Sequence, residues 1–417
     1  MLPYIPILFL FLLFSTRNVV VGSPVASPAP SASAEQPVYM IFFKEEATQQ
    51  EKTDYATKLE NKVSEDYMEA IMEDDDDIYA IAAVLTEKEI PEWKTSIVEK
   101  IESANAQPDE GLLNDKSQIE ARDMYYDRMN TIDPRIDYED MLFLSQPKGL
   151  AMDELTDFTY DDTAGAGVTV YIFDSGINLE HEEFTTSPPG IRRGKISVLK
   201  TKRSKFGKLL DNPMHDEHRD DHGTCVTDRV VGTLYGSAKS ANVKMVPWAW
   251  NRGRRWLWGV EREVLAMVLK GLRTIINDIK EERKKPENKD GFFPVLNLSF
   301  NYHVDKEKNQ KTLQAWHDMI QELIDLDVTI LASAGNNGTM SPRVNDYPAL
   351  FAESFPSMIV VGAVSTRGIP PHFTQGIDDP LVKAFAPGTY GPGRWMRCAA
   401  GQGKNSWQDT AGTSLSA

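Results

Sequence analysis

The sequence predicts a large α/β domain, built on a mainly parallel β-sheet flanked by helices, that follows a small α+β domain. The chain has 417 residues, more than one ordinary domain contains. From Gly167 onward, short apolar runs alternate with longer amphipathic stretches, which is typical of strands joined by crossover helices. Before that, residues 38–103 follow a strand, helix, strand, helix pattern that suits a small separate domain.

The N-terminus contains an apolar run, Ile5–Phe14, that is too short to span a bilayer and is followed by polar residues. This is typical of a signal peptide, assigned to residues 1–22; because no Lys or Arg precedes the run, an uncleaved membrane anchor is the alternative. Small-residue cleavage sites follow Gly22 and Ala34. Residues 23–36 are mainly Ser, Pro and Ala, and this composition predicts a disordered linker.

The small domain is assigned to residues 37–105. Apolar, β-rich runs predict strands at residues 38–43 and 78–85. Helices are expected near residues 47–68 and 87–103. The expected architecture is an antiparallel sheet with its helices on one face.

The large domain is assigned to residues 150–417, after a polar linker at 106–149 that is predicted to contain a processing region. Crossover helices are expected within residues 256–283 and 310–326. The predicted strands of the parallel sheet are residues 168–173, 243–247, 295–300, 328–334 and 358–364.

Charge and cysteine content narrow the function classes. A formal net charge of −17 argues against nucleic-acid binding, which needs clustered Lys and Arg. Two cysteines, Cys225 and Cys398, are too few for a disulfide framework, so the hydrophobic core is expected to hold the fold. Cys225 lies close to His222 and is predicted to be a buried, inert thiol; a reactive thiol is the alternative.

Four side chains carry the candidate chemistry, and each is ambiguous alone. Asp174 ends an apolar strand, where open α/β sheets bind ligands, but Asp-Ser-Gly is also a common turn or helix cap. His222 suits proton transfer near neutral pH, or it is a surface or capping histidine without metal partners at ligand spacing. Ser414 lies in a small-residue turn that can begin a helix, or in a flexible chain end. The side-chain amide of Asn336 follows a buried strand and could donate to an oxyanion, or it belongs to an Asn-Asn-Gly turn.

Taken together, these residues follow the chain order Asp, His, Ser, with the amide donor between His and Ser, as in subtilisin. Five segments resemble the subtilisin-like serine peptidases, with similarity to a fungal branch: FDSGINLEHEEF, HGTCVTDRVVGTLYGSAKSANV, VLNLSF, ASAGNNG and AGTSLSA. Residues 38–104 resemble the inhibitory propeptide of that family, which implies a ferredoxin-like fold for the small domain.

The resemblance implies a secreted serine endopeptidase zymogen that hydrolyses peptide bonds through an acyl-enzyme. Ser414 would attack the carbonyl, His222 would transfer the proton, and Asp174 would orient the imidazole. Asn336 and the backbone amide of Ser414 would hold the oxyanion. The expected partners are protein or peptide substrates and the chain's own propeptide, with neither nucleic acid nor stable membrane association. No cofactor and no metal is required for the reaction, and structural calcium is left open.

Substrate docking is expected along Ser299, Phe300 and Asn301, where the family has Ser-x-Gly. The replacement of Gly by Asn301 puts a Cβ where substrate backbone normally lies, which makes extended-peptide docking less favourable. Ala334 and Gly335 are the other predicted substrate-binding residues.

The sequence departs from the family pattern around the histidine. Asp221 stands where the family has Gly, and together with Asp220 it is predicted to raise the pKa of His222. Asp228 occupies a position that favours small residues, so its carboxylate would be costly to bury unless paired. Its neighbour Arg229 is expected to point elsewhere on the helix.

Only Leu415, Ser416 and Ala417 follow Ser414, where the family has a long apolar helix. The chain as written is therefore expected to be incomplete and inactive, because the nucleophile is not held in place. The alternative function is a truncated or degenerate, non-catalytic member that binds peptide or propeptide without turnover.

Overall fold

The computed structural model describes most of the chain after the N-terminal segment, and the described residues belong to one compact unit, Gln36–Ala417. Four predicted features lie outside the described residues: the signal peptide, the linker at 23–36, most of the processing region, and the pair Asp220 and Asp221. The described ranges are 37–64, 67–74, 76–104, 107–108, 139–161, 163–187, 192–199, 206, 222–247, 264–288 and 291–417.

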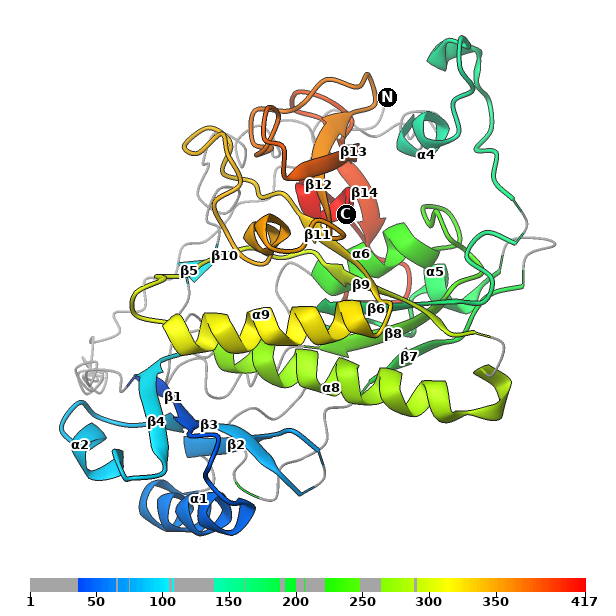
Figure 1. Ribbon diagram of the computed structural model, residues 1–417. Helices are drawn as coiled ribbons and strands as arrows, with labels where there is room; N and C mark the ends of the chain where they lie inside the picture. Colours follow the sequence, from blue (N-terminus) through cyan, green and yellow to red (C-terminus); the bar gives the residue numbers. More distant parts are fainter. Residues whose placement is uncertain are drawn as a thin grey trace, which may run out of the picture. The chain divides into compact units, whose positions relative to one another are not determined.

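The small domain is a four-stranded antiparallel sheet in the order β2-β3-β1-β4 (Figure 1). This βαββαβ order with β1 between β3 and β4 is ferredoxin-like. The predicted strands at 38–43 and 78–85 are confirmed. The elements are β1 (Val38–Phe43), α1 (Gln49–Val63), β2 (Met68–Met72), β3 (Ile78–Val84), α2 (Ile90–Trp93) and β4 (Val98–Ser103).

Both helices cover the same face of this sheet. Leu59 of α1 and Trp93 of α2 share one apolar cluster with Ile41, Ile81 and Ile101 of the strands. The helix α1 begins with a capping box, in which the Thr48 hydroxyl and the Glu51 carboxylate each accept from the other residue's backbone N–H. The predicted placement of helices on one face is thus confirmed.

The predicted helix over residues 87–103 is wrong. Only Ile90–Trp93 is helical there, and β4 follows, paired antiparallel with β1. The exposed charges Glu99 and Lys100 mimic a helix surface, but pairing with β1 outweighs local propensity. The predicted helix at 47–68 is also too long, because its last residue, Met68, begins the edge strand β2.

The large domain contains a seven-stranded sheet in the order β13-β12-β11-β9-β6-β8-β7, and all six pairs of neighbouring strands are parallel. The five predicted strands are confirmed, and two more, β7 and β13, form its edges. The strands are β6 (Val168–Asp174), β7 (Ile196–Val198), β8 (Asn242–Pro247), β9 (Phe293–Leu298), β11 (Thr329–Ser333), β12 (Ile359–Ser365) and β13 (Val382–Thr389).

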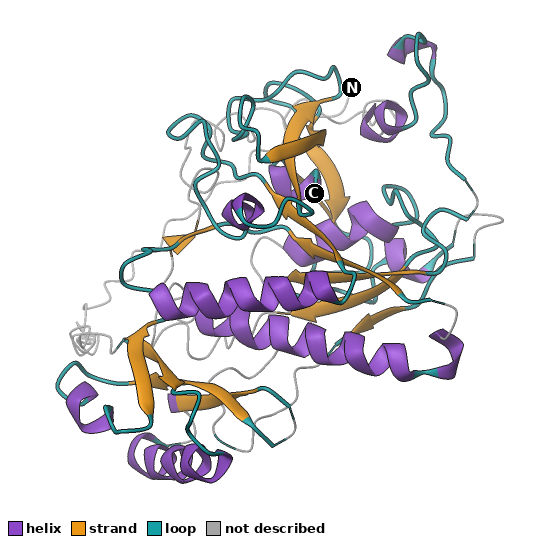
Figure 2. Ribbon diagram, in the orientation of Figure 1, coloured by secondary structure: helices purple, strands orange, loops and turns teal. Residues whose placement is uncertain are grey.

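Helices cover both faces of this sheet (Figure 2). The long helices α8 (Val264–Lys284) and α9 (Gln310–Asp325) pack side by side on one face, in the same apolar cluster as Tyr171 and Phe173. The alternate residues of β6 face the opposite cluster, which includes residues of α5 (Glu182–Thr185) and α6 (His222–Val231). The predicted α/β class is confirmed.

Shorter elements complete the described chain. They are β5 (Gln107–Pro108), α4 (Glu139–Leu144), η3 (Met152–Glu154), η4 (Pro286–Asn288), β10 (Tyr302–His303), η5 (Ala349–Glu353), β14 (Met396–Ala399), β15 (Trp407–Thr410) and η6 (Thr413–Leu415).

The small domain packs on α8 and α9 with the sheet face that its own helices leave open (Figure 1). Met40 and Phe42 of β1 belong to the apolar cluster that contains the core residues of both long helices. At the edge of this contact Lys270 of α8 pairs with Glu69 of β2. The small sheet is therefore covered on both faces.

The core of the large domain can be tested at Trp316 of α9. Its side chain is fully buried among Phe300, Tyr347 and Phe351. Trp316→Ala is expected to lower the free energy of unfolding by about 3–5 kcal/mol, measured by chemical denaturation. Trp316→Phe should cost much less, because among the described groups the indole N–H has no hydrogen-bond partner to lose. An alanine variant as stable as the wild type would contradict this placement.

Candidate active site

Asp174 and His222 meet at the carboxyl edge of the parallel sheet. Asp174 ends β6, an inner strand of the sheet, and His222 is the first residue of α6. His222 Nδ1 lies 2.8 and 2.9 Å from the two carboxylate oxygens, and the Ser175 N–H donates to Asp174 Oδ1 at 2.7 Å. The Asp174 side chain is 1% exposed and that of His222 is 36% exposed. An ionised carboxylate only accepts hydrogen bonds, so this contact puts the imidazole proton on Nδ1 and leaves Nε2 as the basic nitrogen.

The start of α6 is held close to the loop after β6. The Gly223 N–H donates to Ser175 Oγ at 2.9 Å, and Thr224 Oγ1 accepts from the Asn178 N–H at 3.0 Å. A Cβ at Gly223 would lie 2.3 Å from the carbonyl oxygen of Gly176, which no side chain can tolerate. Glycine after His222 is thus required by the close approach of two backbones.

Ser414 lies in η6, beside the end of β9. Its Oγ donates to the Ser299 carbonyl at 3.1 Å, while Ser299 Oγ donates to the Ser414 carbonyl at 3.0 Å. The η6 turn also contacts α6, and Leu415 shares an apolar cluster with Cys225 of that helix. The structure therefore brings the Ser414 turn against the helix that begins with His222.

Asn336 is oriented by the same turn. Its Oδ1 accepts from the Thr413 N–H at 2.8 Å and from Thr413 Oγ1 at 3.0 Å. With the oxygen engaged in this way, the amide presents its Nδ2 donors away from Thr413. Gly335 precedes it with a φ of 109°, and a Cβ there would lie 2.0 Å from Gln375 Oε1. The strand end after β11 and the Ser414 turn are thus interlocked.

The other predicted substrate-binding residues have buried side chains. Ser299 is engaged with Ser414, and Phe300 packs edge-to-face on Phe173 with ring centroids 5.6 Å apart. Asn301 Nδ2 donates to Ser333 Oγ at 2.7 Å, and Ala334 is buried. A peptide docked along this stretch would therefore meet mainly backbone groups.

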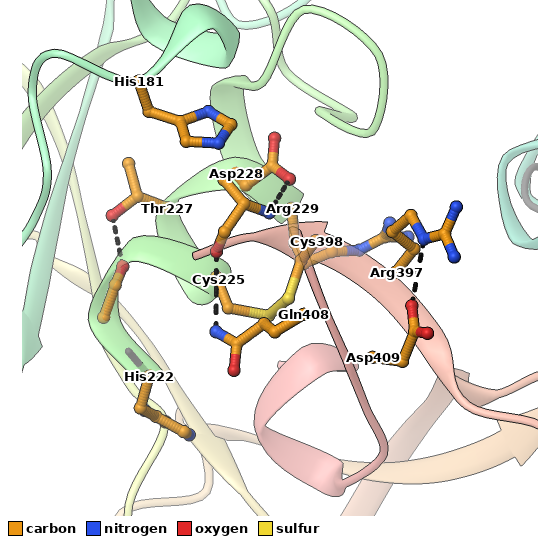
Figure 3. Close-up of a disulfide and its surroundings, with 12 residues drawn as sticks. His181, His222, Cys225, Thr227, Asp228, Arg229, Arg397, Cys398, Gln408 and Asp409 are labelled. Atoms are coloured by element: carbon orange, nitrogen blue, oxygen red, sulfur yellow. Dashed lines mark hydrogen bonds and ion pairs between the residues drawn. A yellow bond between two sulfur atoms is a disulfide. The ribbon is translucent and has the colours of Figure 1, made fainter. Parts of the chain in front are cut away.

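The prediction of an inert free thiol at Cys225 is wrong, because Cys225 and Cys398 form a disulfide with a Cα–Cα distance of 5.1 Å (Figure 3). The chain has no other cysteine. The partners are 173 residues apart in sequence. A single sequence gives no sign of such proximity, which arises only when β14 packs on α6.

Asp228 of α6 is fully buried, and one of its two carboxylate oxygens has no ordinary hydrogen-bond donor within reach among the described groups. Its Oδ2 accepts from the Ala399 N–H at 2.8 Å, and its second oxygen faces the buried carboxyl group of Glu183. Two carboxyl groups can share a hydrogen bond only if one keeps its proton. Burial, followed by the proximity of Glu183, raises the pKa of Asp228 well above its ordinary value. Nearby, burial lowers the pKa of Lys239 to about 8.

Arg229 points away from Asp228, as expected, and pairs with Asp140 of α4. Both partners are buried. The predicted domain boundary at residue 150 therefore follows a helix that already packs on the large domain. Sequence reasoning missed this pair because α4 lies within the stretch 106–149, whose overall polarity predicted a linker.

Within the described ranges, two kinds of feature are absent. No helix there combines the length and the apolar character that crossing a bilayer requires. No group of three or more His, Cys, Asp or Glu side chains in the same ranges is arranged to hold a metal ion.

The large domain is similar to known proteins. The family model described as "Subtilase family" matches residues 165–417. Subtilisin-like protease 2 of Arthroderma benhamiae and that of Trichophyton rubrum are each 29% identical over 260 residues, or 62% of this chain and 50% and 49% of the relatives. The chain spans about half the length of these curated relatives.

A solved structure extends the similarity of fold to the small domain. The epidermin leader peptide processing serine protease from Staphylococcus aureus matches 92% of this chain and 85% of its own, with a TM-score of 0.55 and 16% identity. At this identity the match concerns the fold alone.

The pairing of Asp228 with Glu183 predicts the behaviour of an amide at position 228. The pKa of Asp228 is higher in the folded protein than in the unfolded chain. Its contribution to the free energy of unfolding is therefore largest below the unfolded-state pKa and declines as pH rises. Asp228→Asn can accept from Ala399 and donate to Glu183 without titrating. We expect its melting temperature to equal or exceed that of the wild type, with the difference growing from acidic to mildly alkaline pH. Asp228→Ala is the control and should cost about 1–3 kcal/mol; an Asn variant as unstable as the Ala variant would refute the shared proton.

Proposed function

The chain belongs to the subtilase family, and from this we propose that it is a secreted serine endopeptidase, made as a zymogen, that hydrolyses peptide bonds through an acyl-enzyme. The observation that carries the proposal is the contact between Asp174 and His222 at the sheet edge, with the Ser414 turn packed against the His222 helix. This is the set of groups that acyl transfer from a peptide to a serine needs.

In the proposed reaction, Ser414 Oγ attacks the peptide carbonyl while its proton passes to His222 Nε2. In the resting geometry this hydroxyl donates to the Ser299 carbonyl, so it must turn away from Ser299 before it can donate to the imidazole. The buried Asp174 carboxylate stabilises the imidazolium that forms, and the imidazolium then protonates the leaving amine. Water, activated by His222, releases the acyl group in the second half of the reaction.

The negative charge of the tetrahedral intermediate would fall to Asn336 and to the backbone amide of Ser414. The two hydrogen bonds from Thr413 support this role, because they hold the Asn336 amide in one orientation before the charge develops. Loss of such a donor costs on the order of 3–4 kcal/mol of transition-state stabilisation.

We further propose that the small domain is an inhibitory propeptide. Glu102 of β4 accepts from the first-turn N–H groups of α9, at 2.6 Å from Thr312 and 3.2 Å from Lys311. A carboxylate at a helix N-terminus is favoured by the exposed amides and the helix dipole. Beyond the small domain, β5 pairs antiparallel with β10, which follows the predicted docking stretch directly, in the manner of an added peptide strand.

Secretion is proposed from the apolar N-terminal run together with the disulfide. A structural disulfide suits an oxidising compartment.

The nucleophile can be tested with a fluorophosphonate probe on protein expressed from the complete open reading frame. Labelling is expected in the wild type and in the control Ser357→Ala, whose serine is exposed, and it should vanish in Ser414→Ala. Labelling that survives Ser414→Ala would refute the assignment, and peptide binding without any labelling would favour the non-catalytic alternative.

The role of Asp174 can be tested by steady-state kinetics on the same protein. Asp174→Asn should fold normally yet lower kcat by roughly ten-thousandfold, because the imidazole loses the partner that fixes its tautomer.

The propeptide role predicts a specific effect of Glu102. Small-domain protein added in trans should inhibit hydrolysis of a peptide substrate by the processed protease, and Glu102→Ala in the added domain should raise the inhibition constant about 5- to 30-fold, the effect of losing a helix cap of about 1–2 kcal/mol. Glu99→Ala is the matched control: it lies on the same strand and pairs with Lys311 at an exposed site, so it should change inhibition little. Equal effects of the two variants would count against capping of α9 by Glu102.

A further inference from the structure

The single disulfide joins the two elements that carry His222 and lead to Ser414. Cys225 lies on α6, one turn after His222, and Cys398 lies on β14. β14 pairs antiparallel with β15, and the chain leaving β15 runs directly into η6, which contains Ser414. Both sulfurs are buried, and Figure 3 shows them between α6 and the hairpin.

A hydrogen bond runs parallel to the disulfide. Asp228, one turn further along α6, accepts from the N–H of Ala399, the residue after Cys398. One face of α6 is thus fastened twice to the same strand. The apolar cluster around the sulfurs also contains Leu415, the residue after Ser414. Movement of this junction would therefore be felt on both sides of the site.

We propose that the Cys225–Cys398 disulfide is a positioning element of the active site, which keeps the His222 helix in register with the hairpin that leads to Ser414. The inference rests on the proposed function. Neither cysteine touches the reacting atoms, so both act through the helix and the hairpin. Displacement of catalytic groups by about an ångström can cost roughly a hundredfold in rate, which a single loosened helix turn can produce.

The reaction that opens this junction is thiol–disulfide exchange. An external dithiol attacks one sulfur to form a mixed disulfide, and its second thiol then displaces the protein sulfur. The dithiol ends as its own cyclic disulfide, and Cys225 and Cys398 end as thiols. Two electrons and two protons pass from the reagent to the protein.

The test compares the oxidised and reduced forms of the protease expressed from its complete open reading frame. After treatment with a dithiol at a temperature where the protein stays folded, kcat for a peptide substrate should fall about 10- to 100-fold. The KM should change less than kcat, because the docking stretch Ser299–Asn301 meets the junction only through the Ser414 turn. Reoxidation should restore kcat, and alkylation followed by mass spectrometry verifies that Cys225 and Cys398 were both reduced.

A cysteine-free variant provides the matched control. Cys225→Ala/Cys398→Ala should have the low kcat of the reduced wild type and should not respond to the dithiol. A reduced wild type that keeps its full kcat with both cysteines alkylated would overturn the proposal. If the alanine pair does not fold, the comparison of oxidised and reduced wild type still decides.

Amide hydrogen exchange gives a readout that does not depend on activity. Reduction should increase exchange together in residues 222–231 and 407–415, while the sheet strands β11 and β12 stay protected. If the oxidised protein neither hydrolyses peptides nor reacts with a fluorophosphonate, the proposed function fails, and exchange alone then decides on the junction. Unchanged exchange in both segments would overturn the inference, whereas a joint increase supports it.

Discussion

The site depends on a carboxylate that is held out of water at the end of β6, an inner strand of the sheet. Asp174 is buried, and an uncompensated buried charge is very costly, so its oxygens need partners in fixed positions. They find them in the Ser175 N–H and the imidazole of His222. This requirement places the start of α6 against the end of β6, and the resulting close approach to the Gly176 backbone is the reason why glycine must follow His222. The carboxyl edge of the parallel sheet supplies the place, since the neighbouring strand ends meet there.

Helix α6 is the element to which the other parts of the site are attached. Along this one helix, successive residues reach four different parts of the chain: Gly223 approaches the loop after β6, Cys225 is bonded to β14, Asp228 faces α5, and Arg229 pairs with α4. Such an arrangement gives a short helix little freedom to move. The chemistry proposed for His222 requires this, because proton transfer depends on a fixed distance to the serine.

The sequence predicted the fold well where burial produces a clear hydrophobic pattern. It predicted the fold poorly where a contact between distant segments determines the local structure. The five central strands are apolar on both faces and could be recognised as buried runs. The edge strands β7 and β13 are only partly buried, and β4 carries the exposed pair Glu99 and Lys100, so their patterns are weak. The parallel topology then follows from strands alternating with long helices.

The same division applies to the candidate site. The four candidate site residues could be selected because each belongs to a short motif, and the structure brings together the elements that carry them. They are Asp174, His222, Asn336 and Ser414. The disulfide, the carboxyl pair at Asp228 and the contact of Arg229 with α4 could not be predicted. Each of these joins residues that are distant in the chain, and no local pattern records which partner a buried group will find.

The salt bridges of Arg273 bear on how easily the small domain could separate from the large one. This buried guanidinium contacts Glu73 of the small domain and Glu322 of α9, each at 2.8 Å. One acid would depart with the small domain, whereas the other belongs to the same layer as Arg273 and would remain. Arg273 would have a carboxylate partner whether the small domain is bound or separated. Separation would therefore not leave its charge unpaired, a state that would make dissociation more costly. The interface can therefore combine an apolar contact with reversibility, which the proposed inhibitory role of the small domain would require.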